Sequence, residues 1–236
     1  MATSLSWANR ALFGAVLLIQ LFFLVDGAAL FPAFWKAQHW DVWMPIYIVI
    51  TIAALAASSF LAPKVGAVSP TAFGDPFGMF PMVEVLFIAF FIVSFAVFQI
   101  PTLQLPLNIP VGDATPTVLM NFGVISFTEE LMFRWFLIGL LVKPLKWASV
   151  PISSAAWALF HLAAYGEAPL TLIFIFAIGL ALGALYLMTK DLAGIGAPWG
   201  FHFGWNSGTA GLLSVVVFHF GSNIGTAGLL SVLVFH

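Results

Sequence analysis

The chain has 236 residues, of which 62% are hydrophobic and only 7% charged, whereas an average soluble domain carries about 25% charged residues. This composition excludes an ordinary soluble protein, and 7 Lys and Arg against 9 Asp and Glu leave no basic excess for nucleic-acid binding. The lack of cysteine excludes disulfides, thiolate metal sites and a cysteine nucleophile.

Apolar segments long enough to cross a bilayer, about 20 residues each, recur along the whole chain. The segments between them are too short to form a second domain, so we predict an all-α, polytopic membrane bundle in a single domain, residues 1–236. Its helices, about eight, are expected near 11–31, 44–62, 80–100, 117–142, 146–165, 169–189, 197–217 and 220–235.

The distribution of positive charge predicts the orientation of the bundle. If the amino terminus is cytoplasmic, Lys36 is the only loop cation on the outer side. We therefore expect both termini in the cytoplasm, together with Arg10, Lys64, Lys143, Lys146 and Lys190.

The fourth expected span contains three charged residues, Glu129, Glu130 and Arg134. A charge at the bilayer centre costs about 2.5 to 3.5 kcal/mol on insertion scales, so these side chains need partners. Glu130 and Arg134 are four residues apart, which puts them on one helix face as an ion pair. Glu129 lies about 100° around the helix from Glu130. Its carboxylate therefore does not join this ion pair, and it either takes part in catalysis or has another partner.

Two histidines and an asparagine lie in other expected spans: His161 in the fifth, and His202 with Asn206 in the seventh. The rise of about 1.5 Å per residue places both histidines and Glu129 at depths where they can meet. The glycine- and proline-containing segment 194–200 is expected to break the helix and admit water near them. The alternative is that these polar residues only hold the helices together.

The same residues resemble three motifs of one family, the CAAX-protease and bacteriocin-processing (CPBP, or ABI) membrane proteins. Ser126–Trp135 resembles its EExxxR motif, Trp157–His161 its FxxxH motif, and His202–Asn206 its HxxxN motif. The resemblance covers about 121–207, within expected catalytic core spans over 117–217. Trp157 stands where the second motif usually has Phe.

The resemblance implies an intramembrane endopeptidase similar to the type II CAAX prenyl endopeptidases. Physical reasoning assigns matching roles: Glu129 with His161 activates a water, and His202 with Asn206 stabilises the oxyanion. Arg134 would hold Glu130 as structural support of the site. No cofactor is expected. A metal held by these carboxylates and imidazoles stays an alternative, although no HExxH motif occurs.

The expected partners are the lipid bilayer and a membrane-associated peptide or protein, such as a prenylated CaaX protein, a leader peptide or a pheromone precursor. The expected location is a prokaryotic plasma membrane, which the protein crosses several times. Two other functions stay open: a catalytically silent immunity or scaffold protein of the same fold, and a transporter.

The carboxyl end contains a tandem duplication over 201–234, in which 201–217 recurs almost unchanged as 218–234. A shift of this length turns a helix by about 100° beyond whole turns, so His219 and Asn223 cannot replace His202 and Asn206. We expect the second copy, with the terminal His236, to have no part in the site.

Overall fold

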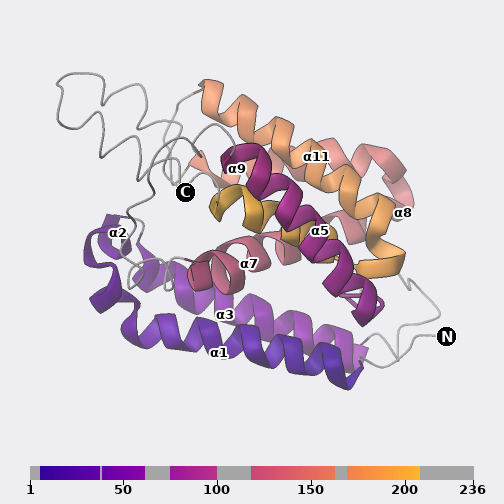
Figure 1. Ribbon diagram of the computed structural model, residues 1–236. Helices are drawn as coiled ribbons and strands as arrows, with labels where there is room; N and C mark the ends of the chain where they lie inside the picture. The colour runs from indigo at the N-terminus through magenta and orange to yellow at the C-terminus, as the bar shows by residue number, and fades with distance from the viewer. Residues whose placement is uncertain (1–5, 38, 62–74, 100–117, 163–168, 208–236) are drawn as a thin grey trace.

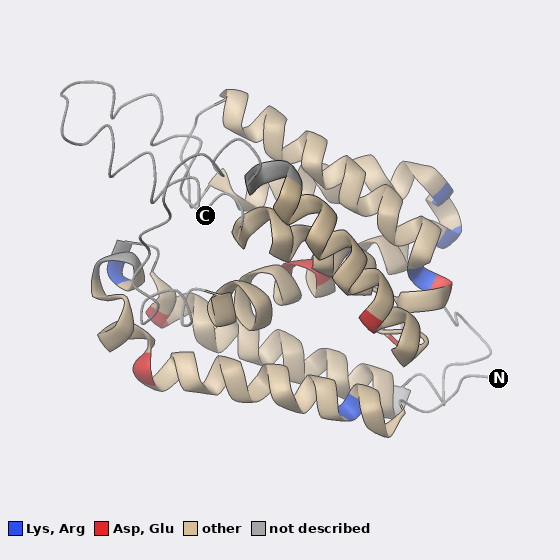
Figure 2. Cartoon of the chain, in the orientation of Figure 1, with Lys and Arg blue, Asp and Glu red and all other residues tan. Residues whose placement is uncertain are grey.

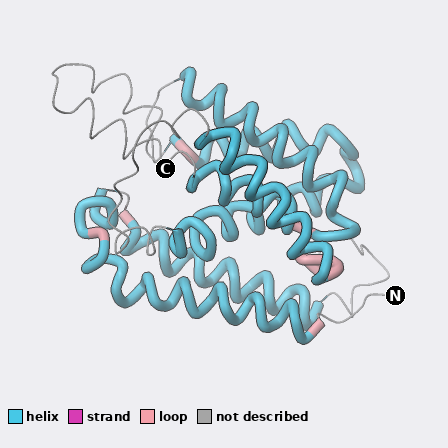
Figure 3. Tube along the Cα trace, in the orientation of Figure 1, coloured by secondary structure: helices cyan, strands magenta, loops and turns pink. Residues whose placement is uncertain are grey.

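The computed structural model describes residues 6–37, 39–61, 75–99, 118–162 and 169–207 (Figure 1). Every regular element in these ranges is a helix, and they contain no strand (Figure 3), which confirms the all-α prediction. Among the described residues, three helices are long and apolar enough to cross a membrane, and a shorter apolar helix covers Phe80–Ala96. These three are Trp7–Leu30, Trp40–Ser59 and Pro169–Ala193.

The outer surface of the bundle is apolar. Val25, Leu170 and Met188 are 76%, 81% and 73% exposed, as side chains that face lipid would be. Together with the three long helices, this surface indicates an integral membrane protein.

The amino-terminal helices form an antiparallel pair. α1 (Trp7–Leu30) and α3 (Trp40–Ala56) lie side by side, joined through the short α2 (Pro32–Ala37) (Figure 1). α1 begins where the Ser6 hydroxyl accepts a hydrogen bond from the Asn9 amide at 3.2 Å. α3 continues into a π-helical turn, η1 (Ala57–Leu61).

A buried amide ties this pair to the centre of the bundle. The Gln20 side-chain amide donates to the Thr51 hydroxyl at 2.9 Å and lies 3.1 Å from both the Gly123 carbonyl and the Thr128 hydroxyl. These partners belong to α3 and to the segment that carries the first motif. Hydrogen bonds of this kind fix the rotation of helices that apolar packing alone would leave free.

The central helical segment runs from residue 118 to 145 and alternates between α-helical and π-helical winding, with four changes. The π-helix η3 (Asn121–Ser126) precedes a single α-helical turn, α7 (Phe127–Glu130). A second π-helix, η4 (Leu131–Ile138), follows and leads into α8 (Gly139–Leu145). π-helical turns are rare and are frequent at functional sites, and here they flank the two glutamates.

The remaining described helices close around the central segment. After the 3₁₀ turn η5 (Lys146–Ala148), α9 (Ser149–Phe160) packs along α11 (Pro169–Ala193). α5 (Phe80–Gln99) runs beside α11 (Figure 1). α9 and α11 approach closely at Gly183, where an added Cβ would lie 2.8 Å from Val150 Cγ1.

The last described helix, residues 196–207, carries the third motif and crosses α5. Gly196, Gly200 and Gly204 recur every four residues on one face of this helix, and a Cβ at Gly200 or Gly204 would collide with the α5 backbone at Phe87 or Phe91. The glycines therefore allow two backbones to approach as in small-xxx-small membrane contacts.

The predicted helix break in 194–200 is present, but it is confined to the first two residues of the segment. Only Gly194 and Ile195 form a turn, in which Gly194 takes a left-handed conformation with φ of 54°. The helix resumes at residue 196, and Pro198 does not interrupt it because proline is tolerated in the first turn of a helix. The other glycines serve packing, and they admit no irregular backbone.

The described cations gather mainly at the end of the bundle where α1 begins and α8 and α11 end (Figure 2). This agrees with the side predicted for most of the loop cations, while the orientation of the termini in a membrane stays a prediction. Lys64, the eighth expected span, most of the duplication and His219, Asn223 and His236 lie outside the described residues.

Candidate active site

The six residues singled out from the sequence all lie in the interior of the bundle, each no more than 4% exposed. Ionisable side chains are almost never buried this completely without partners. They come from the central segment, from the end of α9 and from the helix 196–207. They are Glu129, Glu130, Arg134, His161, His202 and Asn206.

Glu129 lies beside His161, as expected for a shared task. His161 Nε2 is 3.7 Å from Glu129 Oε2. The same carboxylate oxygen accepts a hydrogen bond from the Trp157 indole Nε1 at 2.6 Å, and the Tyr47 hydroxyl of α3 also interacts with the Glu129 carboxylate. The second motif and α3 thus both supply groups that fix the orientation of this side chain.

The backbone determines which nitrogen of His161 carries hydrogen. His161 Nδ1 lies 2.7 Å from the carbonyl oxygen of Trp157, which can only accept a hydrogen bond. Nδ1 is therefore the protonated nitrogen of the neutral ring, and Nε2 presents a lone pair toward Glu129. A water within hydrogen-bond distance of both groups could donate one hydrogen to each.

Glu130 forms the predicted ion pair with Arg134, with Arg134 Nε 3.2 Å from Glu130 Oε2. The other carboxylate oxygen lies 2.8 Å from His202 Nδ1. Sequence reasoning missed this second contact, because the pattern of one helix does not show which side chain of another helix faces it. Glu130 therefore joins the first motif to the third.

Trp157 lies at the centre of these groups. The Arg134 guanidinium lies 4.5 Å above its ring, a cation–π contact. The rings of His161 and His202 meet its edge or face at centroid distances of 4.9 and 5.4 Å. Sequence reasoning treated Trp157 only as an aromatic replacement for Phe. The signal it overlooked is that, unlike Phe, tryptophan carries an N–H donor.

Asn206 lies one turn beyond His202, and its Nδ2 is 3.4 Å from the Ser126 hydroxyl at the start of the first motif. His202 and Asn206 thus face the central segment, whereas Gly200 and Gly204 of the same helix face α5. The glycine contacts hold the two polar side chains toward the carboxylates.

The carboxylates and imidazoles of the site form two pairs, Glu129 with His161 and Glu130 with His202. Within the ranges that the structure describes, no group of three or more His, Cys, Asp and Glu is arranged to hold a metal ion. The arrangement suits proton transfer, because each carboxylate lies beside its own imidazole.

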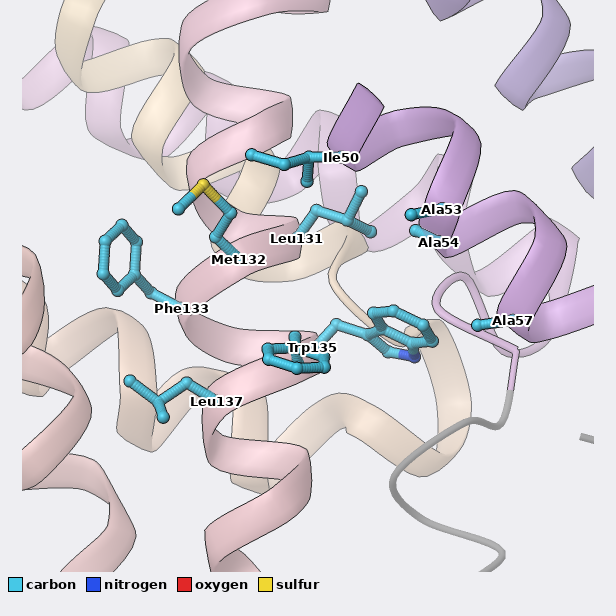
Figure 4. Close-up of a pocket in the computed structure, with 10 residues that line it drawn as sticks. Ile50, Ala53, Ala54, Ala57, Leu131, Met132, Phe133, Trp135 and Leu137 are labelled. Atoms are coloured by element: carbon cyan, nitrogen blue, oxygen red, sulfur yellow. The ribbon is translucent and has the colours of Figure 1, made fainter. Parts of the chain in front are cut away.

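An apolar cavity of about 500 Å³ opens beside the first motif (Figure 4). Its walls are α3 with η1 on one side and η4 on the other, and η4 begins at the residue after Glu130. The lining residues are Ile50, Ala53, Ala54, Ala57, Leu131, Met132, Phe133, Trp135, Phe136 and Leu137. A space of this size and character can hold a hydrocarbon chain or an apolar side chain.

Comparison with known proteins finds one family match. Residues 111–208 match the family model described as type II CAAX prenyl endopeptidase Rce1-like. This match supports membership of the CAAX-protease family for the segment that carries the motifs. The matched Rce1-like segment contains all three motifs and the whole central helical segment. At the family level, the match supports a CAAX-type intramembrane protease that acts on a membrane-associated protein or peptide. No curated protein and no solved structure matches the chain.

Proposed function

We propose that the protein is an intramembrane endopeptidase that cleaves a membrane-associated peptide with water activated by Glu129 and His161. The observation that carries the proposal is the buried pair itself, with 3.7 Å between His161 Nε2 and Glu129 Oε2. Family membership supports the reaction class, and the geometry suggests how these residues perform it.

The first step is attack by water. The Glu129 carboxylate takes one proton of a water bound between it and His161, and the Nε2 lone pair of His161 accepts a hydrogen bond from the other proton. The water oxygen forms a bond to the scissile carbonyl carbon, and the carbonyl electron pair moves onto oxygen. When this oxyanion collapses, the C–N bond breaks and the leaving amine takes the proton from Glu129.

Stabilisation of the oxyanion falls to His202 and Asn206. Because His202 Nδ1 faces the Glu130 carboxylate at 2.8 Å, its hydrogen is committed to that contact. Only the doubly protonated imidazolium then has an Nε2–H to donate to an oxyanion. His202 therefore acts as a cation, and the charges of the two glutamates, Arg134 and His202 add to zero within the buried site.

The apolar cavity supports a substrate with a hydrocarbon group. It begins at Leu131, immediately after Glu130, so a chain lying there would bring the attached peptide close to the carboxylates. A prenylated CaaX peptide has this form, a lipid joined to a cysteine a few residues from its carboxyl end. The neighbouring Ala53, Ala54 and Ala57 leave room for it on the α3 side.

The test is cleavage of labelled prenylated and unprenylated CaaX and leader peptides by the purified protein in nanodiscs, with and without a chelator. We expect the prenylated peptide to be cut in both conditions, and Glu129→Gln and His161→Ala to abolish cleavage while the protein stays folded. Glu84→Gln is the matched control, because this carboxylate is exposed on α5 and should leave the rate unchanged. A folded Glu129→Gln variant with full activity would refute the proposal, and loss of activity with chelator would favour a metal enzyme.

A further inference from the structure

Trp157 contacts both members of the proposed water-activating pair through different parts of the residue. Its indole Nε1 donates to Glu129 Oε2 at 2.6 Å. Its backbone carbonyl accepts from His161 Nδ1 at 2.7 Å. The carbonyl contact is available to any residue at this position, whereas the indole contact requires a tryptophan.

The indole contact determines how the Glu129 carboxylate is presented. Oε2 carries the Trp157 hydrogen bond and also faces His161 Nε2. A donor fixed on one oxygen holds the plane of the carboxylate, and a buried hydrogen bond to a charged group is among the stronger ones in proteins. The ring that provides this donor is itself held, because it is 4% exposed and packs between Arg134 and the two histidines.

The Arg134 contact strengthens the same donor. A cation above the face of an indole withdraws electron density from the ring, which makes its N–H a better hydrogen-bond donor. The guanidinium lies 4.5 Å from the ring centroid while its Nε pairs with Glu130 at 3.2 Å. Trp157 thus connects the Glu130–Arg134 pair electrostatically to Glu129.

From these contacts we propose that Trp157 is a positioning residue whose indole N–H orients the Glu129 carboxylate toward the attacking water. The inference rests on the proposed function for its effect on rate, although the hydrogen bond itself can be observed without any activity. In this protein the second motif supplies both His161 and the Trp157 indole, which orients the Glu129 carboxylate.

The first test is Trp157→Phe, which keeps an aromatic ring and the backbone contact to His161 but removes the N–H. We expect kcat to fall by about 10- to 100-fold, as for loss of a hydrogen bond to a charged group, with KM within about twofold because no substrate contact is lost. Trp199→Phe is the matched control, since Trp199 is also buried and its indole donates to the Phe122 carbonyl at 2.9 Å, away from the carboxylates. It should lower thermal stability and leave kcat unchanged.

A second variant covers the case in which Trp157→Phe does not fold. Replacement of Trp157 by 3-benzothienylalanine exchanges the N–H for sulfur in a bicyclic ring of nearly the same shape. Packing is then preserved, so a fall in kcat equal to that of Trp157→Phe would be due to the missing donor. Full kcat in this variant would overturn the inference.

The third measurement is independent of catalysis. In protein carrying ¹⁵N-labelled indole, the resonance assigned to Trp157 by its loss in Trp157→Phe should lie downfield, and Glu129→Gln should move it upfield. Glu84→Gln should not move it. An unmoved Trp157 resonance in Glu129→Gln overturns the positioning role whether or not the protein cleaves a peptide. If Glu129→Gln abolishes cleavage but Trp157→Phe keeps the wild-type kcat, the proposed function stands and the positioning role is wrong.

Discussion

His202 Nδ1 lies 2.8 Å from Glu130 Oε1, so a buried contact joins the helix of the third motif to that of the first. Glu130 thereby contacts basic side chains of two helices, since its other oxygen pairs with Arg134. The Glu130 carboxylate thus connects two helices and also contributes a negative charge beside two basic side chains. Its removal should therefore affect both stability and the orientation of His202.

Glu130→Gln should destabilise the protein by about 3 to 5 kcal/mol, the usual cost of removing one partner of a buried ion pair. The expected reason is that Arg134, only 1% exposed, loses its paired charge. Unfolding of the purified protein in detergent measures this change. The double variant Glu130→Gln with Arg134→Met should recover much of the loss, and a single variant as stable as the wild type would show that the pair contributes nothing.

Asn206→Ala should lower kcat by about 100- to 1,000-fold, as removal of one oxyanion donor does in other hydrolases. KM should change little, because the contact forms only as charge develops on the carbonyl oxygen. His202→Ala should have at least as large an effect, with His39→Asn as its control, because His39 is exposed and asparagine tolerates its left-handed backbone with φ of 53°. Steady-state kinetics on the cleaved peptide would check both, and a pure KM effect would contradict the assignment.

Gly200→Ala should destabilise the protein and reduce activity, although alanine is the better helix former by about 1 kcal/mol. Its Cβ would collide with the Phe87 backbone of α5 and push away the helix that carries His202. Gly14→Ala in α1 is the matched control, because a Cβ there meets no atom within 4 Å. Thermal unfolding of both variants tests the contact, and equal stability of the two would argue against close packing at Gly200.

Asp75 should make stability depend on pH. It lies in the turn before α5, where burial raises the pKa of its carboxyl above the ordinary value, although hydrogen bonds from Phe77, Asn9 and Gly78 oppose the shift. In the window between the ordinary and the raised pKa, the folded protein holds a proton that the unfolded chain has lost. The Asp75 contribution to stability is therefore present at the lowest pH. It is lost as the pH rises through the pKa of Asp75 in the folded protein.

The measurement is the midpoint of thermal unfolding from about pH 4 to about pH 7, compared between wild type and Asp75→Asn. Asparagine keeps an oxygen to accept the Phe77 amide hydrogen bond, which is 2.9 Å long in the native protein. The difference between the two proteins should grow in favour of Asp75→Asn as pH rises. A constant difference across this range would mean that Asp75 does not titrate with folding.

The sequence could predict what lies within one helix. The apolar composition predicted an all-helical membrane protein, the four-residue spacing predicted the Glu130–Arg134 pair, and the three motifs predicted the family. These features depend on local chemistry and helical periodicity. The catalytic roles of Glu129, His161, His202 and Asn206 stay predictions.

Contacts between helices could not be derived in the same way, because periodicity fixes a face of each helix but not its rotation against a neighbour. The Glu130–His202 contact, the approach of Tyr47 to Glu129 and the Trp157 hydrogen bond are all of this kind. The helix break predicted for 194–200 proved shorter than expected for a related reason, because only Gly194 of its glycines lies in the turn. A glycine that permits close packing and a glycine that ends a helix look the same until the opposing helix is known.

The two walls of the apolar cavity differ in how freely they can change during evolution. Residues 131–137 continue the helix of the first motif, so their backbone is bound to the site. The opposite wall, from Ile50 to Ala57, lies outside the segment that matches the family. Single substitutions of its three lining alanines, Ala53, Ala54 and Ala57, by larger residues would fill part of the cavity. Changes in α3 and η1 could therefore alter the length or bulk of an apolar group that fits the cavity, while the residues of the three motifs stay the same.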